Sequence, residues 1–399
     1  MSSSRLALPA TLLSALACGS GSSAPAPPPF HVAAGDNVLP LSVNGAHCAS
    51  GSYLNKPCVS VTVCAPGTAT CQTIDDVLLD TGSFGLRLFK QALTVSIPAV
   101  PASDGGSLAE CVQFADGTAD WGPVATADVV LANEPAVRVP IQVIDSTFGA
   151  VPPSCGSPET GPTSGNGILG VGVFTEDCGP ACAADPANGM YFSWNGSTIS
   201  SAAAPTSAQV QNPVALLPVD NNGLIVALPG VPAAGAPAVE GAVVLGIGTR
   251  ANNRPGPAMT LALDGSGDFT TTVSGGPAIP GSFVDTGSNG LFFPPPSPIP
   301  TCADHPEWFC PPAVVSLSAT CTPSPGRAGA STQVSFQIAN FDALVVQPNE
   351  GNDVFAQIGG GATSKAGFDW GLPFFLGRTV YLGLEGRRST LGMGPFVAY

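Results

Sequence analysis

The sequence predicts a mostly β protein built from two lobes. Three observations lead to this expectation: an abundance of residues that interrupt helices, an alternation of apolar and polar residues, and an internal repeat. The chain of 399 residues contains 49 glycines and 42 prolines, and both residue types are unfavourable inside helices. A helical bundle or a coiled coil is therefore excluded, and a β-rich protein with many turns remains.

The composition also excludes several classes of partner. Charged residues make up 10 % of the chain, and 12 basic against 27 acidic residues leave a net charge of −15. Nucleic-acid backbones are bound by basic surfaces, so we expect no nucleic-acid partner. Apolar residues make up 44 %, too many for a disordered chain. No apolar run reaches the roughly 18 residues of a transmembrane helix.

The N-terminus is typical of an exported protein. Arg5 precedes an apolar segment from Leu6 to Leu16, which ends in Ala17-Cys18 and a Ser/Pro-rich run. This order is that of a signal peptide, and Cys18 resembles the lipidated cysteine of a bacterial lipobox. We predict a signal peptide over 1–18, a tether over 19–29, and membrane contact through a lipid anchor at Cys18. The alternative is an ordinary signal peptide cleaved nearby, and export is expected either way.

Twelve cysteines in an exported chain predict disulfides. Lipidation of Cys18 would leave eleven, so we expect at least one free thiol unless Cys18 is not lipidated. Cys178 and Cys182 are expected to close a small loop. A metal site of Cys302, His305 and Cys310 is a weak alternative, and we expect neither a metal nor an organic cofactor.

An internal repeat organises the chain. Residues 77–86 match residues 282–291 at six of ten positions, and both copies contain Asp-Thr-Gly-Ser followed by Gly-Leu. A Leu-Gly step follows each copy at a similar interval, in Ile168-Leu169-Gly170 and in Phe375-Leu376-Gly377. Two unrelated loops seldom share both a motif and its spacing to a second one. We therefore predict homologous lobes over 30–185 and 215–399, joined by a connection over 186–214.

Within both predicted lobes, apolar residues alternate with polar ones. The alternating apolar sets are Val59, Val61 and Val63 in the first lobe, and Val334, Phe336 and Ile338 in the second. This period of two is typical of half-buried strands in antiparallel sheets. Apolar triplets precede both Asp-Thr-Gly-Ser motifs, so each aspartate is expected where a buried strand enters a glycine turn.

Paired Asp-Thr-Gly-Ser loops in a two-lobed β chain resemble those of the pepsin-like aspartic peptidases. The resemblance implies a double β-barrel with a cleft between the lobes. It also implies that each aspartate loop lies against one of the two apolar-apolar-Gly elements named above. The finer sequence, such as Asn-Gly-Ile-Leu-Gly-Val-Gly, is similar to an uncharacterised family of bacterial exported proteins with a domain of unknown function.

The resemblance assigns roles to both loops. Asp80 and Asp285 would share one proton, because two carboxylates about 3 Å apart cannot both ionise. One carboxylate would activate a water, and the other carboxyl would assist the scissile carbonyl. The threonines would cross-link the two loops, and the glycines would let the backbone approach the carboxylates closely. The serine hydroxyls would form hydrogen bonds with the outer carboxylate oxygens. These supporting residues are Thr81, Gly82, Ser83, Thr286, Gly287 and Ser288.

Two positions depart from the pepsin-like pattern. The stretch over 112–118 matches the flap that covers the cleft, with its Asp116-Gly117 turn, but Phe114 stands where the family has tyrosine. Arg87 stands where the family commonly has tryptophan. Arg87 has two interpretations: a strand residue facing solvent or a surface acid, or a cation beside the cleft that lowers the pKa values of the dyad or holds a substrate carboxylate.

Two functions therefore follow from the sequence. The first is an exported aspartic endopeptidase, monomeric, acting on polypeptides. The alternative is a catalytically silent envelope lipoprotein that binds peptide or glycan on the same scaffold. The intact Asp80 and Asp285 favour the enzyme, whereas Phe114 and Arg87 favour the binding protein.

Overall fold

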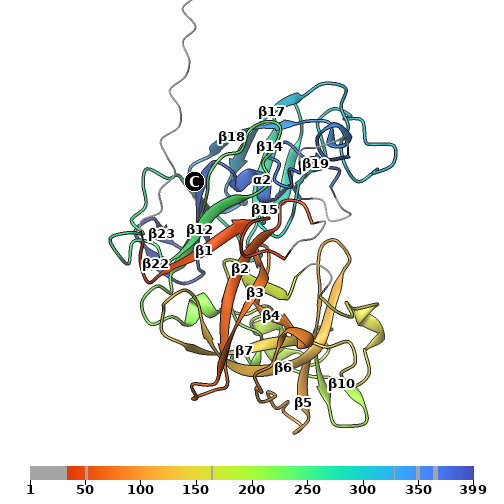
Figure 1. The fold of residues 1–399 in the computed structure, drawn as a ribbon, viewed down its shortest axis with the longest axis vertical. Coiled ribbons are helices and arrows are strands. Elements are labelled where there is room, and N and C mark those ends of the chain that lie inside the picture. Colours follow the sequence, from red (N-terminus) through yellow and green to blue (C-terminus); the bar gives the residue numbers. More distant parts are fainter. Residues whose placement is uncertain (1–33, 50–52, 163–164, 328, 347–350, 363–366) are drawn as a thin grey trace, which may run out of the picture. The chain divides into compact units, whose positions relative to one another are not determined.

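A computed structural model describes residues 34–49, 53–162, 165–327, 329–346, 351–362 and 367–399. The expected signal peptide, tether and lipidation site at Cys18 lie outside these residues. The described residues all belong to one compact unit. Its secondary structure is mostly β, and the strands form two β-barrel lobes (Figure 1).

The first lobe contains a closed barrel of six strands. They run in the order β6-β7-β4-β8-β3-β2, and β2 pairs again with β6 to complete the circle. Val59, Val61 and Val63 in β2 are fully buried, which confirms the predicted alternation. The strands of this barrel are β2 (Pro57–Cys64), β3 (Cys71–Asp80), β4 (Phe84–Phe89), β6 (Ala119–Val130), β7 (Val137–Ile144) and β8 (Gly167–Val171).

A hairpin extends from this barrel. Its strand β5 (Ser107–Gln113) pairs with the first half of β6, and β9 (Tyr191–Trp194) and β10 (Ile199–Ser201) continue the sheet beyond β5. The segment expected as a connection, 186–214, therefore contributes two strands to the sheet of the first lobe.

The second lobe contains a nearly closed barrel of seven strands in the order β18-β17-β14-β15-β20-β16-β19. In β18, Val334 and Ile338 are buried, whereas Gln333, Ser335 and Gln337 are exposed, as the alternation predicts. These strands are β14 (Phe269–Val273), β15 (Ala278–Val284), β16 (Leu291–Phe292), β17 (Val315–Thr322), β18 (Thr332–Ile338), β19 (Gly359–Gly360) and β20 (Asp369–Trp370).

A sheet of six strands joins the two barrels. β1 (Val38–Val43) begins it, pairs with β2 of the first barrel, and runs antiparallel to β12 (Val239–Leu245), which lies beside it in Figure 1. The order continues through β11 (Gly223–Leu228), β21 (Arg378–Gly383), β24 (Phe396–Ala398) and β13 (Thr260–Ala262). This sheet shares one continuous apolar core with both barrels.

The remaining elements are short. A two-stranded ribbon is formed by β22 (Arg388–Ser389) and β23 (Gly392–Met393). The α-helices are α1 (Pro180–Ala184) and α2 (Leu372–Phe375). Single turns of other helix types occupy Lys90–Ala92, Pro153–Cys155, Thr206–Ala208, Pro213–Leu216 and Asp342–Val346. Among the described residues, none of these helices is long and apolar enough to traverse a lipid bilayer.

Five disulfides join ten of the described cysteines, which indicates folding in an oxidising compartment. Cys178 pairs with Cys182, as predicted, and Cys321 is a free, buried thiol, so the expectation of an unpaired cysteine is also confirmed. The other four pairs are Cys48–Cys58, Cys64–Cys71, Cys111–Cys155 and Cys302–Cys310.

Candidate functional site

Two aspartate loops with matching hydrogen bonds form the centre of the site. Asp80 ends β3, and Asp285 follows the last residue of β15. The N–H of the glycine two residues on donates to Oδ1 of each aspartate, at 2.7 Å in both loops. Ser83 donates to Oδ2 of Asp80 at 2.5 Å, and Ser288 lies 2.9 Å from Oδ2 of Asp285. The sequence repeat is therefore also a repeat of local structure.

The two loops are cross-linked by four hydrogen bonds between the lobes. The Thr81 N–H donates to Oγ1 of Thr286 at 3.1 Å, and the Thr286 N–H donates to Oγ1 of Thr81 at 3.0 Å. Each hydroxyl then donates to the backbone carbonyl that precedes the opposite aspartate, that of Val284 or of Leu79. Both threonines are buried. The expected cross-link is present, and it holds the two aspartates in one fixed arrangement.

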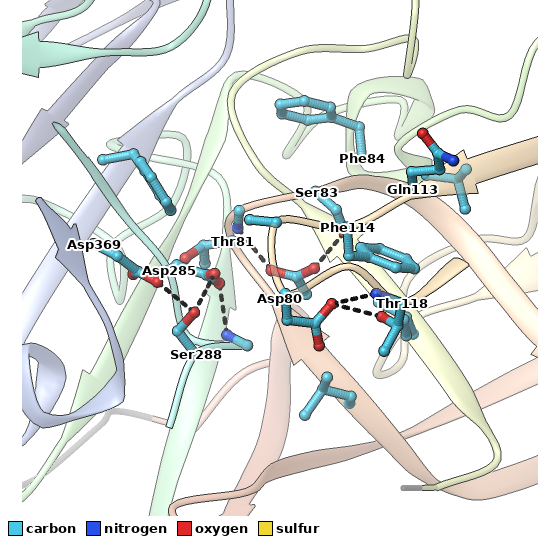
Figure 2. Close-up of a pocket in the computed structure, with 18 of the residues that line it drawn as sticks. Asp80, Thr81, Ser83, Phe84, Gln113, Phe114, Thr118, Asp285, Ser288 and Asp369 are labelled. Atoms are coloured by element: carbon cyan, nitrogen blue, oxygen red, sulfur yellow. Dashed lines mark hydrogen bonds between the residues drawn. The ribbon is translucent and has the colours of Figure 1, made fainter. Parts of the chain in front are cut away.

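The carboxyl groups of Asp80 and Asp285 face each other at the centre of Figure 2. A Cβ atom at Gly82 would lie 2.7 Å from Cγ of Asp285, and one at Gly287 would lie 2.9 Å from Oδ1 of Asp80. Glycine is therefore needed because the opposite carboxyl comes so close. Burial raises the pKa of Asp285 well above its usual range, and the charge of Asp80 raises it further. Such a pair is suited to holding one shared proton.

The aspartates lie in a pocket of about 1170 Å³ lined by both lobes. The tip of the β5–β6 hairpin forms part of this lining, through Phe114, Asp116 and Thr118. Phe114 and Thr118 close the turn, with the Phe114 N–H donating to the Thr118 carbonyl at 2.9 Å. Oδ1 of Asp116 accepts from the N–H and the hydroxyl of Thr118, and Gly117 supplies the left-handed backbone (φ +91°) of the turn. The stretch expected as a flap is thus a hairpin beside the aspartates.

Arg87 is buried in an ion-pair network. Its side chain is 1 % exposed, and Nη2 lies 2.8 Å from Glu110 and 2.9 Å from Asp177, which are equally buried. Nη1 donates to the carbonyl of Phe84 at 2.6 Å, and Tyr191 donates to the second oxygen of Asp177. The interpretation of Arg87 as facing solvent or a surface acid is therefore wrong. Arg87 also belongs to the lining of the pocket that holds the two aspartates, so the interpretation in which it acts on the dyad or on a substrate carboxylate stays a prediction.

The glycine element against the first aspartate loop is the expected one. In β8, Ile168, Leu169 and Gly170 run parallel to β3, with Gly170 opposite Asp80. A Cβ at Gly170 would lie 2.6 Å from the backbone nitrogen of Phe84. Glycine is therefore required where β8 passes the loop.

The counterpart in the second lobe is not Phe375-Leu376-Gly377. Strand β20 runs parallel to β15, with Asp369 opposite Phe283 and Trp370 opposite Val284, so that Gly371 follows opposite Asp285. A Cβ at Gly371 would lie 2.6 Å from the carbonyl oxygen of Ser288. Phe375 instead ends helix α2, and Leu376 bridges Leu228 in the connecting sheet. The prediction was wrong because it required two apolar residues before the glycine, whereas the second lobe has Asp369 at the position that Ile168 occupies in the first.

Two functional candidates were missed by sequence reasoning. Asp369 lies in the pocket lining, 2.6 Å from Oγ of Ser288, and alignment of the repeats at Gly371 would have revealed it. Tyr53 also lines the pocket, and its phenol donates to the carbonyl of Gly287. Burial, followed by the charges of Asp285 and Asp80, raises the pKa of Tyr53, so it remains a neutral hydroxyl. No local pattern marks Tyr53, because only the fold brings it to the dyad.

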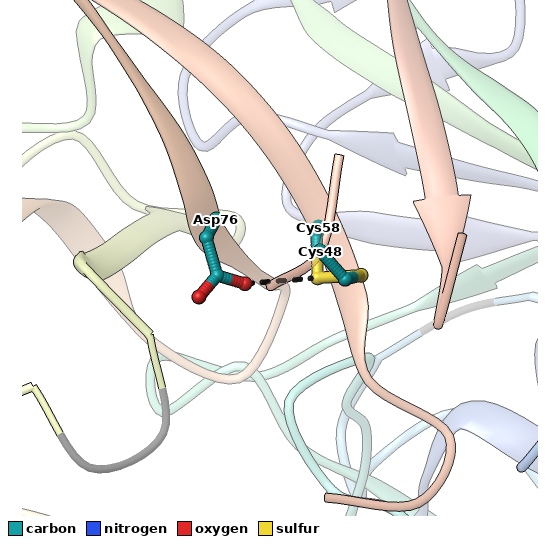
Figure 3. A group of neighbouring side chains, drawn as sticks. All are labelled: Cys48, Cys58 and Asp76. Carbon is teal, nitrogen blue, oxygen red and sulfur yellow. Dashed lines mark hydrogen bonds between the residues drawn. A yellow bond between two sulfur atoms is a disulfide. The ribbon is translucent and has the colours of Figure 1, made fainter. Parts of the chain in front are cut away.

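The two groups of potential metal ligands among the described residues both contain a disulfide. One comprises Cys48, Cys58 and Asp76, in which Oδ1 of Asp76 lies 3.5 Å from Sγ of Cys58 (Figure 3). That carboxylate is already bound by Lys56 Nζ at 2.5 Å. In the other, Cys302 and Cys310 are bonded to each other. Because metal coordination needs free thiolates, the alternative site of Cys302, His305 and Cys310 is wrong.

A comparison with protein families identifies a family that matches most of the chain. The family model described as "Protein of unknown function (DUF3443)" matches residues 33–399. No curated protein matches the chain. The matched range includes both barrels and both Asp-Thr-Gly-Ser loops.

Proposed function

Because the chain belongs to the DUF3443 family, whose description names no activity, we propose its function from the site alone. The protein is an exported aspartic endopeptidase, in which Asp80 and Asp285 activate a water molecule for attack on a peptide bond. We also infer that its two barrel lobes are of the pepsin-like type, with the pocket as the substrate cleft.

One observation carries the proposal: the two carboxyl groups meet in one pocket and have equivalent donors. Each has a glycine N–H on Oδ1 and a serine hydroxyl against Oδ2. The threonine cross-link fixes their separation. A purely structural acidic pair is unfavourable, because two adjacent buried carboxylates repel each other. Such an arrangement is instead suited to general acid–base chemistry.

The reaction follows from the shared proton. The ionised member takes a proton from a water molecule, whose oxygen adds to the peptide carbonyl carbon. The protonated member donates its proton to the carbonyl oxygen. When this tetrahedral intermediate collapses, the amide nitrogen receives the proton that the first carboxylate took from water, and the C–N bond breaks. A hydroxyl proton of the intermediate returns to the other carboxylate, which restores the shared proton of the dyad. The products are a carboxylic acid and an amine, and no covalent enzyme intermediate forms.

The hairpin tip and Tyr53 would close the site around the substrate. Phe114 supplies an aromatic wall without a hydroxyl group. The phenol of Tyr53 is held by Gly287, within one of the two aspartate loops. A polypeptide is the substrate class that we propose, because the pocket is lined by both lobes and its volume of about 1170 Å³ exceeds that of an ordinary small-molecule site.

A second function uses the same pocket to bind peptide or glycan without hydrolysis, on a lipid-anchored envelope protein. Phe114 favours it, because the flap lacks the hydroxyl of the pepsin-like peptidases. The intact dyad with its full set of donors opposes it.

Cleavage of a mixed peptide library between about pH 3 and 7 tests the proposal. Wild type and Asp285→Asn are compared, with Asp128→Asn as the matched control, because Asp128 belongs to an exposed ion pair with Arg138. We expect cleavage by wild type and the control, loss in Asp285→Asn, and inhibition by a statine-type transition-state mimic. Circular dichroism confirms that each variant is folded. A folded wild type that binds peptides in calorimetry but cleaves none would establish the binding function instead.

A further inference from the structure

The hydroxyl of Ser288 lies between two carboxyl groups. Its Oγ is 2.9 Å from Oδ2 of Asp285 and 2.6 Å from Oδ2 of Asp369 (Figure 2). A serine hydroxyl has one proton and donates to one acceptor, whereas an ionised carboxylate only accepts. Both contacts are hydrogen bonds only if one of the carboxyl oxygens carries a proton.

The environments of the two carboxyl groups place that proton on Asp369. Asp285 has the N–H of Gly287 on its other oxygen. In contrast, Oδ1 of Asp369 is buried and has no hydrogen-bond partner among the described residues. An ionised carboxylate with a bare, buried oxygen is strongly unfavourable, whereas the carbonyl oxygen of a neutral acid tolerates it better.

The charges around Asp369 act in the same direction. The titratable groups that face it are Asp285, Asp80 and the phenol of Tyr53, and none of them is cationic. Burial raises the pKa of Asp369 to about 8, the hydrogen bond with Ser288 opposes this rise, and the charge of Asp80 adds to it. Asp369 is therefore neutral throughout the acid range.

The first lobe has no such group. In its matching register position Ile168 lies opposite Leu78, just as Asp369 lies opposite Phe283. Ser83 accordingly contacts one carboxyl group, that of Asp80. The third acid is thus an asymmetric addition to an otherwise symmetric pair of loops.

We propose that Asp369 is a positioning residue that holds a proton outside the dyad: it donates to Ser288, so that the Ser288 hydroxyl is directed at Asp285. This role rests on the proposed peptidase function. When Asp369 ionises, Ser288 loses its donor and a third negative charge lies beside the dyad. The ionisation of Asp369 therefore sets the alkaline limit of activity.

The protonation state is tested first, by a measurement that needs no activity. Infrared difference spectra at pH 7 compare wild type with Asp369→Asn, in the C=O stretching region of protonated carboxylic acids. We expect wild type to show a carboxylic acid band that the variant lacks. Asp128→Asn is the control, because the hydrogen bond from Arg138 lowers the pKa of Asp128, and its loss removes no such band. Absence of a difference band in Asp369→Asn overturns the proposal.

The positioning role is tested by the pH profile of kcat/KM. Asparagine at 369 still donates to Ser288 but cannot ionise, so we expect the alkaline limb of Asp369→Asn to move to higher pH by about one unit or more. Asp369→Leu imitates the first lobe and removes the donor. We expect it to fold and to lower kcat at all pH values, with no change in KM. An unchanged alkaline limb in Asp369→Asn overturns the positioning role of Asp369. A wild type that cleaves no peptide but shows the infrared band overturns the peptidase function, while the protonated state of Asp369 remains established.

Discussion

Replacement of Arg87 by methionine tests the buried ion-pair network of the first lobe. The side chains of Arg87, Glu110 and Asp177 are 1 %, 0 % and 2 % exposed, so solvent cannot replace the lost cation. The substitution also leaves the carbonyl of Phe84 without the Nη1 donor. Removing one partner of a buried pair costs about 3–5 kcal/mol. We expect Arg87→Met to lower the free energy of unfolding by that amount at pH 7.

The difference in free energy of unfolding between wild type and Arg87→Met should depend on pH. Burial, together with the charge of Glu110, already raises the pKa of Asp177 well above its usual range, and the attraction of Arg87 opposes this rise. Without Arg87 the folded-state pKa rises further. An acid with a raised folded-state pKa stabilises the folded state at low pH and loses that contribution as pH rises. Arg87→Met should therefore differ less from wild type at about pH 4 than at pH 7.

Urea unfolding followed by tryptophan fluorescence measures both effects. Arg138→Met is the matched control, because Arg138 also pairs with a carboxylate, that of Asp128, but its side chain is 58 % exposed. Exposed pairs contribute about 0–1 kcal/mol. If Arg87→Met destabilises no more than Arg138→Met, or if its deficit grows as pH falls, the assignment of a buried, charge-balancing role to Arg87 is refuted.

Three further outcomes are expected from urea unfolding. Thr286→Val leaves the Leu79 carbonyl and the Thr81 N–H unpaired between the lobes, so it should lower the free energy of unfolding by about 2–4 kcal/mol. The control Thr62→Val, at an exposed hydroxyl pair, should change it by less than about 0.5 kcal/mol. Equal effects of the two variants would contradict the cross-link. Removing the disulfide Cys111–Cys155, with a sequence separation of 44, should lower the free energy of unfolding by about 4 kcal/mol. Removing Cys178–Cys182, with a separation of 4, should lower it by about 2 kcal/mol. The reverse order would contradict an origin of this stabilisation in the entropy of the closed loop. Burial raises the pKa of Asp120 to about 7, against the attraction of Arg87, so its stabilising effect is lost as pH rises from about 4, the usual pKa of an aspartate, to about 7. We expect the urea midpoint to fall across that range and to fall less in Asp120→Asn, and a midpoint that rises in wild type would disprove this.

The features that the sequence predicted correctly are local or repeated. The strands Pro57–Cys64 and Thr332–Ile338 follow from alternation, because side chains in a strand point to opposite faces in turn. The two aspartate loops follow from their shared Asp-Thr-Gly-Ser, since each set of glycine and serine donors lies within three residues of its own aspartate.

The features that were missed depend on pairing between distant segments. Trp370 and Gly371, rather than Leu376 and Gly377, lie beside the second aspartate loop, because strand register places them there. A short apolar-Gly pattern recurs by chance within a few residues, so spacing alone did not distinguish the two.

The fold class, the two lobes and the two aspartate loops could be predicted from the sequence, because backbone propensity, alternation and repetition depend on neighbouring residues. The electrostatics of the site could be read only from the folded structure. It placed Arg87 between two acids that are 23 and 90 residues away along the chain, and it brought Asp369 to Ser288 across 81 residues. Whether a charged side chain is solvated, neutralised or protonated depends on which groups surround it in space, and those groups come from distant parts of the chain.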